Sequence, residues 1–270
     1  MEKSNIDEKI KLLTGNGMWH TQETEDLPSV HLSDGPHGLR KQEEKERQNN
    51  VSLVSTCYPT ASALACSWDV TAAERLGRAV AKEAWNADVA VLLGPGINMK
   101  RSPLCGRNFE YFSEDPFLAG RLGAAYVSAA QGEDVAVSLK HFAANNQEPN
   151  RQTSNSQIDE RALREIYLSA FEYVVKTARP ATIMASYNRL NGYYACENRH
   201  LLTEILREEW GFDGVVISDW GACADLAKAV KAGMDLEMPD SHGIDRHGFH
   251  GPQVYIQDIP SHLLPVDVAH

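Results

Sequence analysis

The chain has 270 residues, of which 43% are hydrophobic, and its formal net charge is −11 at pH 7. The apolar content supports a sizeable core and excludes a disordered chain, and the length suits one α/β barrel of about 250 residues. The acidic balance argues against nucleic acid or an anionic membrane as a partner, and no apolar run is long enough to span a membrane. A neutral substrate such as a sugar remains open.

The N-terminus and the cysteines indicate a compartment. Residues 1–9 lack the apolar core of a signal peptide, and the five cysteines form no C-x-x-C pair. An odd number of thiols without paired spacing is typical of a reduced setting. We therefore expect a cytoplasmic protein whose thiols are buried or idle.

Short apolar runs alternate with helical patterns along the chain. In chain order, the expected elements are a helix over 6–13, a strand over 30–33, an apolar run over 60–65, a helix over 71–87, a strand over 89–93, a helix over 116–131, a strand over 135–139, a helix over 160–176, a strand over 181–186, a helix over 200–209, a strand over 215–218, a helix over 222–232 and a strand over 234–238. Asp115 before Pro116 marks one helix start, and Asp159 marks another. Polar loops over 97–115 and 144–157 are long enough to favour a functional role.

The alternation of strands and helices predicts an α/β fold with a mainly parallel sheet. A (β/α)8 TIM-like barrel over residues 1–240, irregular at its first strands and incomplete at its last helix, suits the length and the number of elements. A doubly wound open sheet is the alternative. It is less favoured because no G-x-G-x-x-G or Walker sequence follows any strand.

Polar side chains stand where several of these strands end. Asp34, Lys140 with His141, Tyr187 and Asp219 each follow an apolar run directly. In a barrel these positions gather at one rim, around one pocket. Asp219 alone could be the N-cap of the next helix. Four strands with polar groups at the same relative position favour a catalytic role for it instead.

Six motifs occur in a characteristic order. They are residues 33–40 (SDGPHGLR), 106–110 (GRNFE) with 113–116 (SEDP), 140–148 (KHFAANNQE) with Arg151, 159–167 (DERALREIY), 184–188 (MASYN) and 218–220 (SDW). Across residues 5 to 240 they resemble the motifs of glycoside hydrolase family 3, the retaining β-glucosidase family. The resemblance implies the N-terminal catalytic barrel of that family.

The resemblance also implies a chemistry. Retaining glycosidases use a carboxylate nucleophile and a second carboxyl as acid/base, about 5 to 5.5 Å apart. By resemblance Asp219 is the nucleophile. Because it must be ionised, we expect cationic neighbours, which Lys140, His141, Arg107 and Arg151 can supply.

These four cationic groups can also donate hydrogen bonds to sugar hydroxyls. By resemblance Asp34 accepts from two hydroxyls of the sugar, Tyr187 lies beside the nucleophile, and Trp220 forms an apolar wall. The implied substrate is a β-glucoside or a small oligosaccharide, with no cofactor and no metal.

Each of these residues also has a plainer interpretation. Asp34 could be a turn former, Lys140 and His141 a solvated pair, Arg107 and Arg151 surface charges paired with Glu110 and Glu148, Tyr187 a core residue, and Trp220 a packing residue. Sequence alone leaves these alternatives open.

The acid/base carboxyl is where the sequence departs from the family. In β-glucosidase members it lies in an α/β sandwich domain after the barrel, and we expect this domain to be absent here. One branch of the family instead uses a histidine in a K-H-F-P-G-H-G motif, which KHFAANN lacks. The other carboxyls that could approach the pocket are Glu110, Glu148 and Glu237.

Residues 241–270 are expected to form an irregular tail, disordered or unrelated to the fold. Three of its five histidines, His242, His247 and His250, could suggest a metal site but lack the spacing of metal ligands.

Three hypotheses follow. The first is a retaining β-glucosidase barrel that has weak activity because its acid/base is missing; whether an oligomer or another partner supplies that group is open, and β-xylosidase activity is a variant of this hypothesis. The second is a truncated, non-catalytic sugar-binding barrel. The third is a Schiff-base lyase that uses Lys140, which the SDW motif disfavours.

Overall fold

A parallel sheet forms the centre of the molecule. The computed structural model describes residues 8–42 and 51–240. The five strands lie in the order β10-β7-β5-β4-β3. Their bounds are β3 (Leu32–Asp34), β4 (Val91–Leu93), β5 (Ala136–Phe142), β7 (Thr182–Ala185) and β10 (Val215–Ser218). All neighbouring pairs in this sheet are parallel, as the alternation of strands and helices predicts.

Short bridges close this sheet into a barrel. Ile217 pairs in parallel with Leu236, and Glu237 pairs in parallel with Thr14. Next come β1 (Gly15–Asn16) and β2 (His20–Thr21), which are antiparallel, and His20 then pairs with His31 just before β3. The ring in the described residues thus consists of β1, β2, β3, β4, β5, β7, β10 and the segment at Leu236. The barrel is irregular at its first strands, and β2 runs against the others.

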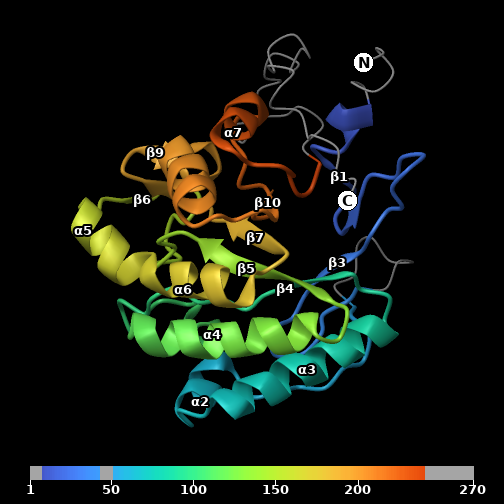
Figure 1. Cartoon of the computed structure of the whole chain (residues 1–270), viewed down its shortest axis with the longest axis vertical. Helices are drawn as coiled ribbons and strands as arrows, with labels where there is room; N and C mark the ends of the chain where they lie inside the picture. The colour runs from blue at the N-terminus through green and yellow to red at the C-terminus, as the bar shows by residue number, and fades with distance from the viewer. Residues whose placement is uncertain (1–7, 43–50, 241–270) are drawn as a thin grey trace.

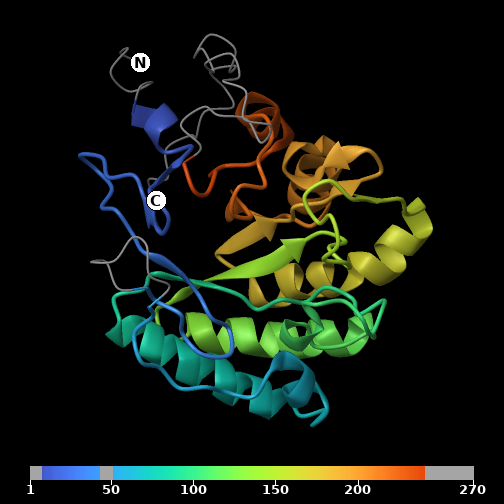
Figure 2. The ribbon, with the colours of Figure 1, turned by 180° about the vertical axis from the view of Figure 1, so that it is seen from behind.

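Helices cover the outside of the barrel (Figures 1 and 2). Their bounds are α2 (Ala61–Ala65), α3 (Val70–Asn86), η1 (Asn108–Glu110), α4 (Pro116–Gln131), α5 (Glu160–Ala162), η2 (Leu163–Tyr167), α6 (Ser169–Ala178), η3 (Ala195–Glu197), η4 (His200–Glu209) and α7 (Leu226–Ala232). A small sheet of β6 (Asn155–Ser156), β8 (Arg189–Leu190) and β9 (Tyr193–Tyr194) lies beside them. No helix in the described ranges is long and apolar enough to cross a membrane.

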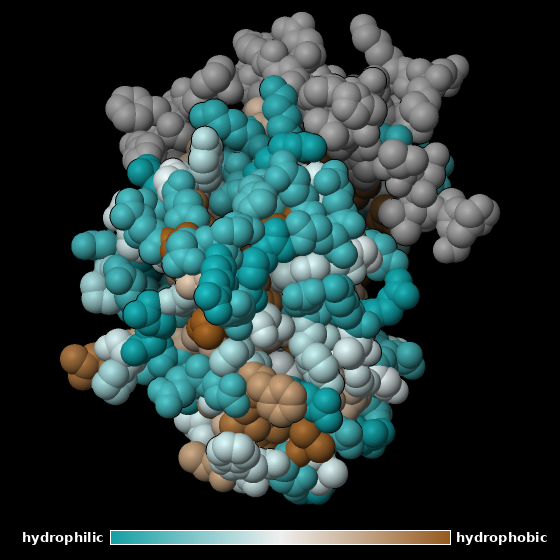
Figure 3. All heavy atoms as spheres, turned by 60° about the vertical axis from the view of Figure 1, so that its left-hand side comes forward, coloured by the Kyte–Doolittle hydropathy of each residue, from teal (hydrophilic) through white to brown (hydrophobic). Residues whose placement is uncertain are grey.

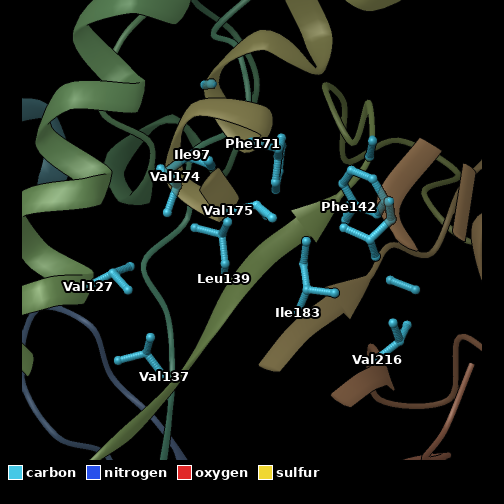
Figure 4. Packing of buried hydrophobic residues seen from close by; sticks show 14 of the residues in the cluster. Ile97, Val127, Val137, Leu139, Phe142, Phe171, Val174, Val175, Ile183 and Val216 are labelled. Atoms are coloured by element: carbon cyan, nitrogen blue, oxygen red, sulfur yellow. The ribbon is translucent and has the colours of Figure 1, made fainter. Parts of the chain in front are cut away.

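The core lies between the sheet and the helices α3, α4 and α6. Leu139 of β5 faces α6, where Val174 and Val175 lie (Figure 4). The rings of Phe142 and Phe171 meet edge to face with centroids 5.2 Å apart. The side of the molecule seen in Figure 3 is largely hydrophilic, with apolar residues gathered mainly at its lower edge. The amphipathic helices therefore bury their apolar side against the sheet, as their helical periodicity predicts.

Several local signals act as expected. Asp115 caps α4 by accepting from the N–H groups of Phe117 and Leu118. Asp159 caps α5 through the N–H of Ala162. In both cases a carboxylate satisfies backbone donors that a first helical turn leaves free.

Other expectations need correction. The apolar run over 60–65 forms helix α2, and the helix expected over 160–176 contains the π-helical turn η2, which leaves Ile166 41% exposed. The helix expected from residue 222 begins at Leu226 and is capped by Asp225, not by Asp219. Residues 241–270, with their three named histidines, lie outside the described residues.

Candidate active site

One pocket of about 560 Å³ opens at the carboxyl ends of the barrel strands. Asp34 ends β3, Lys140 lies near the end of β5, Tyr187 follows β7 and Asp219 follows β10. All four line the pocket, together with Trp19, Gly35, Pro36, His37, Gly38, Arg40, Arg107, Phe109, Glu110, Arg151, Met184 and Trp220. The structure therefore brings the strand-end residues together at one rim, because parallel strands end on the same side of a barrel.

Asp219 lies at the base of this pocket and is 7% exposed. Its Oδ1 accepts from the N–H of Trp220 at 2.8 Å. Its Oδ2 has no hydrogen-bond partner within residues 8–42 and 51–240. Because Asp225 caps the following helix, the plain capping interpretation of Asp219 fails, and a buried carboxylate oxygen remains available to a ligand.

Arg107 is the cation nearest to this oxygen among the described residues. Its Nη1 lies 3.9 Å from Oδ2 of Asp219, and its Nε donates to Glu110. Burial disfavours the guanidinium charge, but the field of Tyr111, Glu110 and Asp219 outweighs it and raises the pKa of Arg107. Arg107 is thus a fixed, partly buried cation and not a surface charge.

His141 is fully buried and does not line the described pocket, but its Nε2 lies 3.7 Å from Oδ2 of Asp219 and contacts Nη2 of Arg107. Burial first, and then the positive charges of Arg107, Lys140 and Arg151, lower its pKa well below the ordinary value. The expectation that His141 supplies positive charge is therefore wrong, because the cations that surround it exclude its own protonation. Burial also rules out a solvated Lys140–His141 pair, since Lys140 is only 4% exposed.

Lys140 joins Asp34 across the pocket. Its Nζ lies 3.5 Å from Oδ1 of Asp34. No backbone N–H of the described chain donates to the Asp34 carboxylate, so the turn at residues 34–38 does not depend on this side chain. Gly35 makes the turn instead: its φ is +115°, and a Cβ there would meet the carbonyl oxygen of Gly38 at 2.1 Å.

Arg151 and Tyr187 form a second wall. The Arg151 guanidinium carbon lies 4.5 Å from the centroid of the Tyr187 ring, and its Nη1 donates to Glu148 at 2.9 Å. The Tyr187 hydroxyl donates to the carbonyl of Trp220. Burial and the nearby Asp219 charge raise the pKa of Tyr187, which keeps the phenol neutral beside the carboxylate.

The indole of Trp220 has a partner that sequence reasoning missed. Its ring packs on Trp19 with centroids 5.2 Å apart, and its Nε1 donates to the carbonyl of Met18. Phe109, 55% exposed, also lines the pocket. The signal that the sequence offered for Phe109 was an aromatic residue within the polar motif 106–110, whereas nothing near Trp19 in the sequence indicates its place.

The electrostatic balance at Asp219 is not the one expected from its cations alone. Burial raises its pKa most strongly, the charges of Arg107 and Lys140 and the N–H of Trp220 lower it, and Asp34 raises it. The net shift is upward. Desolvation therefore exceeds the stabilisation that the two cations and one hydrogen bond give to the ionised form.

The described part of the chain offers no cluster of metal-binding side chains. No group of three or more His, Cys, Asp or Glu side chains is arranged there to hold an ion. The pocket instead combines carboxylates, cations and aromatic surfaces, a set that suits a neutral polyhydroxylated ligand.

The fold and the pocket define an α/β barrel with a buried carboxylate among cations, an arrangement typical of barrel enzymes. Comparisons with known proteins identify the family. The family model described as the glycosyl hydrolase family 3 N terminal domain matches residues 36–252. The chain belongs to this family.

Named relatives agree with this assignment. The thermostable beta-glucosidase B of Acetivibrio thermocellus is 53% identical over 248 residues, which cover 90% of this chain and 33% of the relative. The exo-alpha-(1->6)-L-arabinopyranosidase of Bifidobacterium longum is 49% identical over 246 residues, 89% of this chain and 32% of the relative. The chain thus spans about a third of the length of these relatives.

A solved structure has the same fold. The crystal structure of the GH3 beta-glucosidase from Bifidobacterium adolescentis superposes with a TM-score of 0.86 and 46% sequence identity, over 96% of this chain and 37% of that chain. The barrel fold expected from the sequence is therefore confirmed.

Proposed function

We propose that this chain hydrolyses terminal, non-reducing β-D-glucosyl residues by a retaining double displacement with Asp219 as nucleophile. The observation that carries the proposal is Oδ2 of Asp219, which is buried in the pocket without a hydrogen-bond partner in the described ranges. Relatives named beta-glucosidase support the sugar and the reaction.

In the first displacement, Oδ2 of Asp219 attacks the anomeric carbon, and the bond from that carbon to the aglycone oxygen breaks. The leaving oxygen takes a proton from the acid/base, and a glycosyl ester of Asp219 forms. In the second, water attacks the same carbon, gives its proton to the acid/base and releases Asp219. Arg107 beside Oδ2 stabilises the ionised carboxylate at the start and the end of the cycle.

The other pocket residues bind the sugar in this proposal. Asp34 and Lys140 form an acceptor–donor pair 3.5 Å apart, which fits neighbouring hydroxyls of one ring. Arg151 donates to a further hydroxyl, and Trp220 covers the apolar face of the ring. His141 contacts Arg107 through Nε2, and the same nitrogen lies 3.7 Å from Oδ2 of Asp219, so His141 is proposed to orient these two groups.

The acid/base carboxyl is proposed to come from outside residues 8–42 and 51–240. Asp34 pairs with Lys140, and Glu110 pairs with Arg107, so each of these pocket carboxylates already forms an ion pair. Glu148 and Glu237 do not line the described pocket. The remainder of a longer polypeptide, an oligomer or another partner is the proposed source.

Two further proposals rest on the sequence. The barrel domain is proposed to end near residue 240, and the family match runs on to residue 252, so it includes the first part of the segment expected to be an unrelated tail. The cytoplasm is the proposed compartment.

The test of the nucleophile is covalent labelling. A 2-deoxy-2-fluoro-β-D-glucoside with a 2,4-dinitrophenyl leaving group needs Asp219 but no acid, so intact-mass spectrometry should detect one fluoroglucosyl group, on the peptide that contains Asp219. Asp219→Asn should remove the label, and the matched control Asp225→Asn, which keeps a good helix cap, should retain it. A folded wild-type chain that stays unlabelled contradicts the proposal.

A second experiment locates the acid/base. If that group is absent from the described pocket, 2,4-dinitrophenyl β-glucoside should form the glucosyl ester, which then hydrolyses slowly. Azide needs no general base and should restore turnover, with β-glucosyl azide as product. Fast turnover without azide, and none of the azide product, would place the acid/base within this pocket.

A second candidate activity has one specific observation in its favour. The relative from Bifidobacterium longum, 49% identical, is named for L-arabinopyranosides. Relative kcat/KM values for p-nitrophenyl β-glucoside, α-L-arabinopyranoside and β-xyloside separate the three sugars. Tight calorimetric binding of an iminosugar with no labelling and no turnover would support the non-catalytic barrel.

A further inference from the structure

A buried chain of hydrogen bonds leads from the protein core to Arg107. The hydroxyl of Tyr111 lies 3.0 Å from Nδ1 of His141, and Nε2 of His141 lies 2.7 Å from Nη2 of Arg107. Tyr111 and His141 are both fully buried. Water therefore does not compete for these contacts, and each partner must match the other as donor and acceptor.

The chemistry of the three groups leaves one arrangement. A guanidinium has only donors, so Nε2 of His141 must accept from Arg107. His141 is neutral, because burial and nearby cations lower its pKa, and its single proton must then lie on Nδ1. This Nδ1–H donates to the oxygen of Tyr111.

The backbone around His141 fixes where the ring lies but not which nitrogen holds the proton. Asn98 accepts from the His141 N–H at 2.7 Å and donates to its carbonyl at 2.8 Å. Gly96 bridges to both Tyr111 and Lys140, and a Cβ at Gly96 would lie 2.9 Å from the Tyr111 ring. Tyr111 is thereby held against β5, and its hydroxyl is the only described partner of Nδ1.

We propose that Tyr111 is a positioning residue: it holds His141 in the Nδ1–H tautomer, so that Nε2 accepts from Arg107 and keeps this guanidinium beside Asp219. The tautomer follows from the hydrogen-bond geometry at the two ring nitrogens and from the neutral state of His141, whereas its consequence for catalysis rests on the proposed function. Without the hydroxyl, the Nε2–H tautomer becomes accessible, and it would place two donors 2.7 Å apart. Arg107 would then move away from Oδ2.

The pH dependence of this effect involves every charged or titratable group around Asp219. These groups are Arg107, Glu110 and Tyr111 from the segment at η1, Lys140 and His141 from β5, Asp34 from β3 with His37 and Arg40 from the turn after it, and Tyr187 and Arg151 from the opposite wall. Among them, Tyr111→Phe changes the tautomer of His141, whose Nε2 lies 3.7 Å from Oδ2 of Asp219, and through it the position of Arg107. Loss of that cation should make Asp219 harder to ionise.

The direct test is the tautomer itself. Long-range ¹H–¹⁵N spectra of the full chain labelled in histidine distinguish a protonated from an unprotonated ring nitrogen, and His141→Gln assigns the His141 signals. We expect Nδ1 of His141 to be protonated in the wild type. A protonated Nε2 in the folded wild type would overturn the proposal, whatever the activity of the protein.

The functional test compares Tyr111→Phe with Tyr167→Phe, a control in which a buried tyrosine loses a hydrogen bond to Arg101 away from the pocket. Tyr111→Phe should slow fluoroglucoside labelling on the order of 10-fold, the lower end of the effect seen when a metal-bound histidine loses its outer hydrogen-bond partner. It should also move the acidic limb of the pH profile upward, which a general loss of stability would not do.

A double mutant tests whether the effect of Tyr111→Phe is transmitted through His141. In His141→Gln the side-chain oxygen can accept from Arg107 whatever residue 111 is, so Tyr111→Phe should cost little more in that background. Equal effects of Tyr111→Phe in both backgrounds, or an unmoved acidic limb, would overturn the proposal. A wild type that is never labelled contradicts the proposed function but leaves the spectroscopic result intact.

Discussion

Nη1 of Arg107 lies 3.9 Å from Oδ2 of Asp219, the carboxylate oxygen that has no hydrogen-bond partner in the described chain. The two groups are close enough to attract but not to form a tight hydrogen bond. The site therefore holds a buried carboxylate that its cations only partly compensate, and the pKa of Asp219 is raised by burial.

The first prediction concerns pH and labelling. Because Asp219 must be ionised to attack, its labelling rate should fall as the pH drops through the raised pKa. The acidic limb should therefore lie above 3.8, the ordinary value for this side chain. Initial labelling rates measured by intact mass over a pH series check this. A limb below that value would show that the cations outweigh burial.

The second prediction concerns stability. A raised folded-state pKa means that the folded protein binds this proton more tightly than the unfolded chain. The resulting stability is present below pH 3.8 and is lost as the pH rises through the raised pKa. Asp219→Asn should therefore increase the free energy of unfolding near neutral pH by about 1 kcal/mol. Urea unfolding at several pH values measures this, and the gain should shrink in acid.

The third prediction concerns the sugar-binding carboxylate. Asp34→Asn keeps the shape but removes the charge, and hydrogen bonds to charged groups contribute about 1.5–3 kcal/mol. We expect kcat/KM for an aryl glucoside to fall by about 10- to 100-fold. Asp225→Asn is the control in a helix cap outside the pocket. Equal effects of both substitutions would argue that Asp34 contributes only to folding.

The fourth prediction concerns Trp19. Its ring packs on Trp220 at the pocket, and aromatic pairs contribute about 0.5–1.5 kcal/mol beyond their burial. Trp19→Ala should raise KM for aryl glucosides by about 5-fold. Trp85→Ala, at a tryptophan of α3 that is 60% exposed and away from the pocket, should leave KM unchanged. Steady-state kinetics of both variants measure these KM values and test the prediction.

The fifth prediction concerns the packing of α3 on α4. A Cβ at Gly77 would lie 2.5 Å from the carbonyl oxygen of Tyr126, so the two helices approach closely only at a glycine. Gly77→Ala should reduce the free energy of unfolding by about 1–3 kcal/mol. Gly132→Ala, where the nearest atom is 3.3 Å from the added Cβ, is the matched control. Thermal unfolding of both variants would measure the loss of stability and show whether the close contact between α3 and α4 requires glycine at position 77.

Local signals predicted much of the fold. The strand over 215–218 and the helix over 116–131, with Asp115 as its cap, have the expected bounds. Such features depend on side chains a few residues apart, so the sequence contains them directly. The helix after Asp219 was placed too early, because the chain after β10 is held by the carbonyls of Leu236 and Met238, which accept from Ser218 and Gly221 and come later in the chain.

The sequence by itself determined the α/β barrel, the strand-end carboxylates and the family, since periodicity, caps and motifs are local properties of the chain. Only the tertiary structure decided that His141 is neutral, that Trp19 reaches the pocket, and that β2 runs antiparallel to close the barrel. Each of these depends on burial, or on contacts between segments distant in sequence. Desolvation and long-range packing cannot be inferred from residues that are neighbours in the sequence. At Asp219, desolvation raises the pKa by more than the nearby cations lower it.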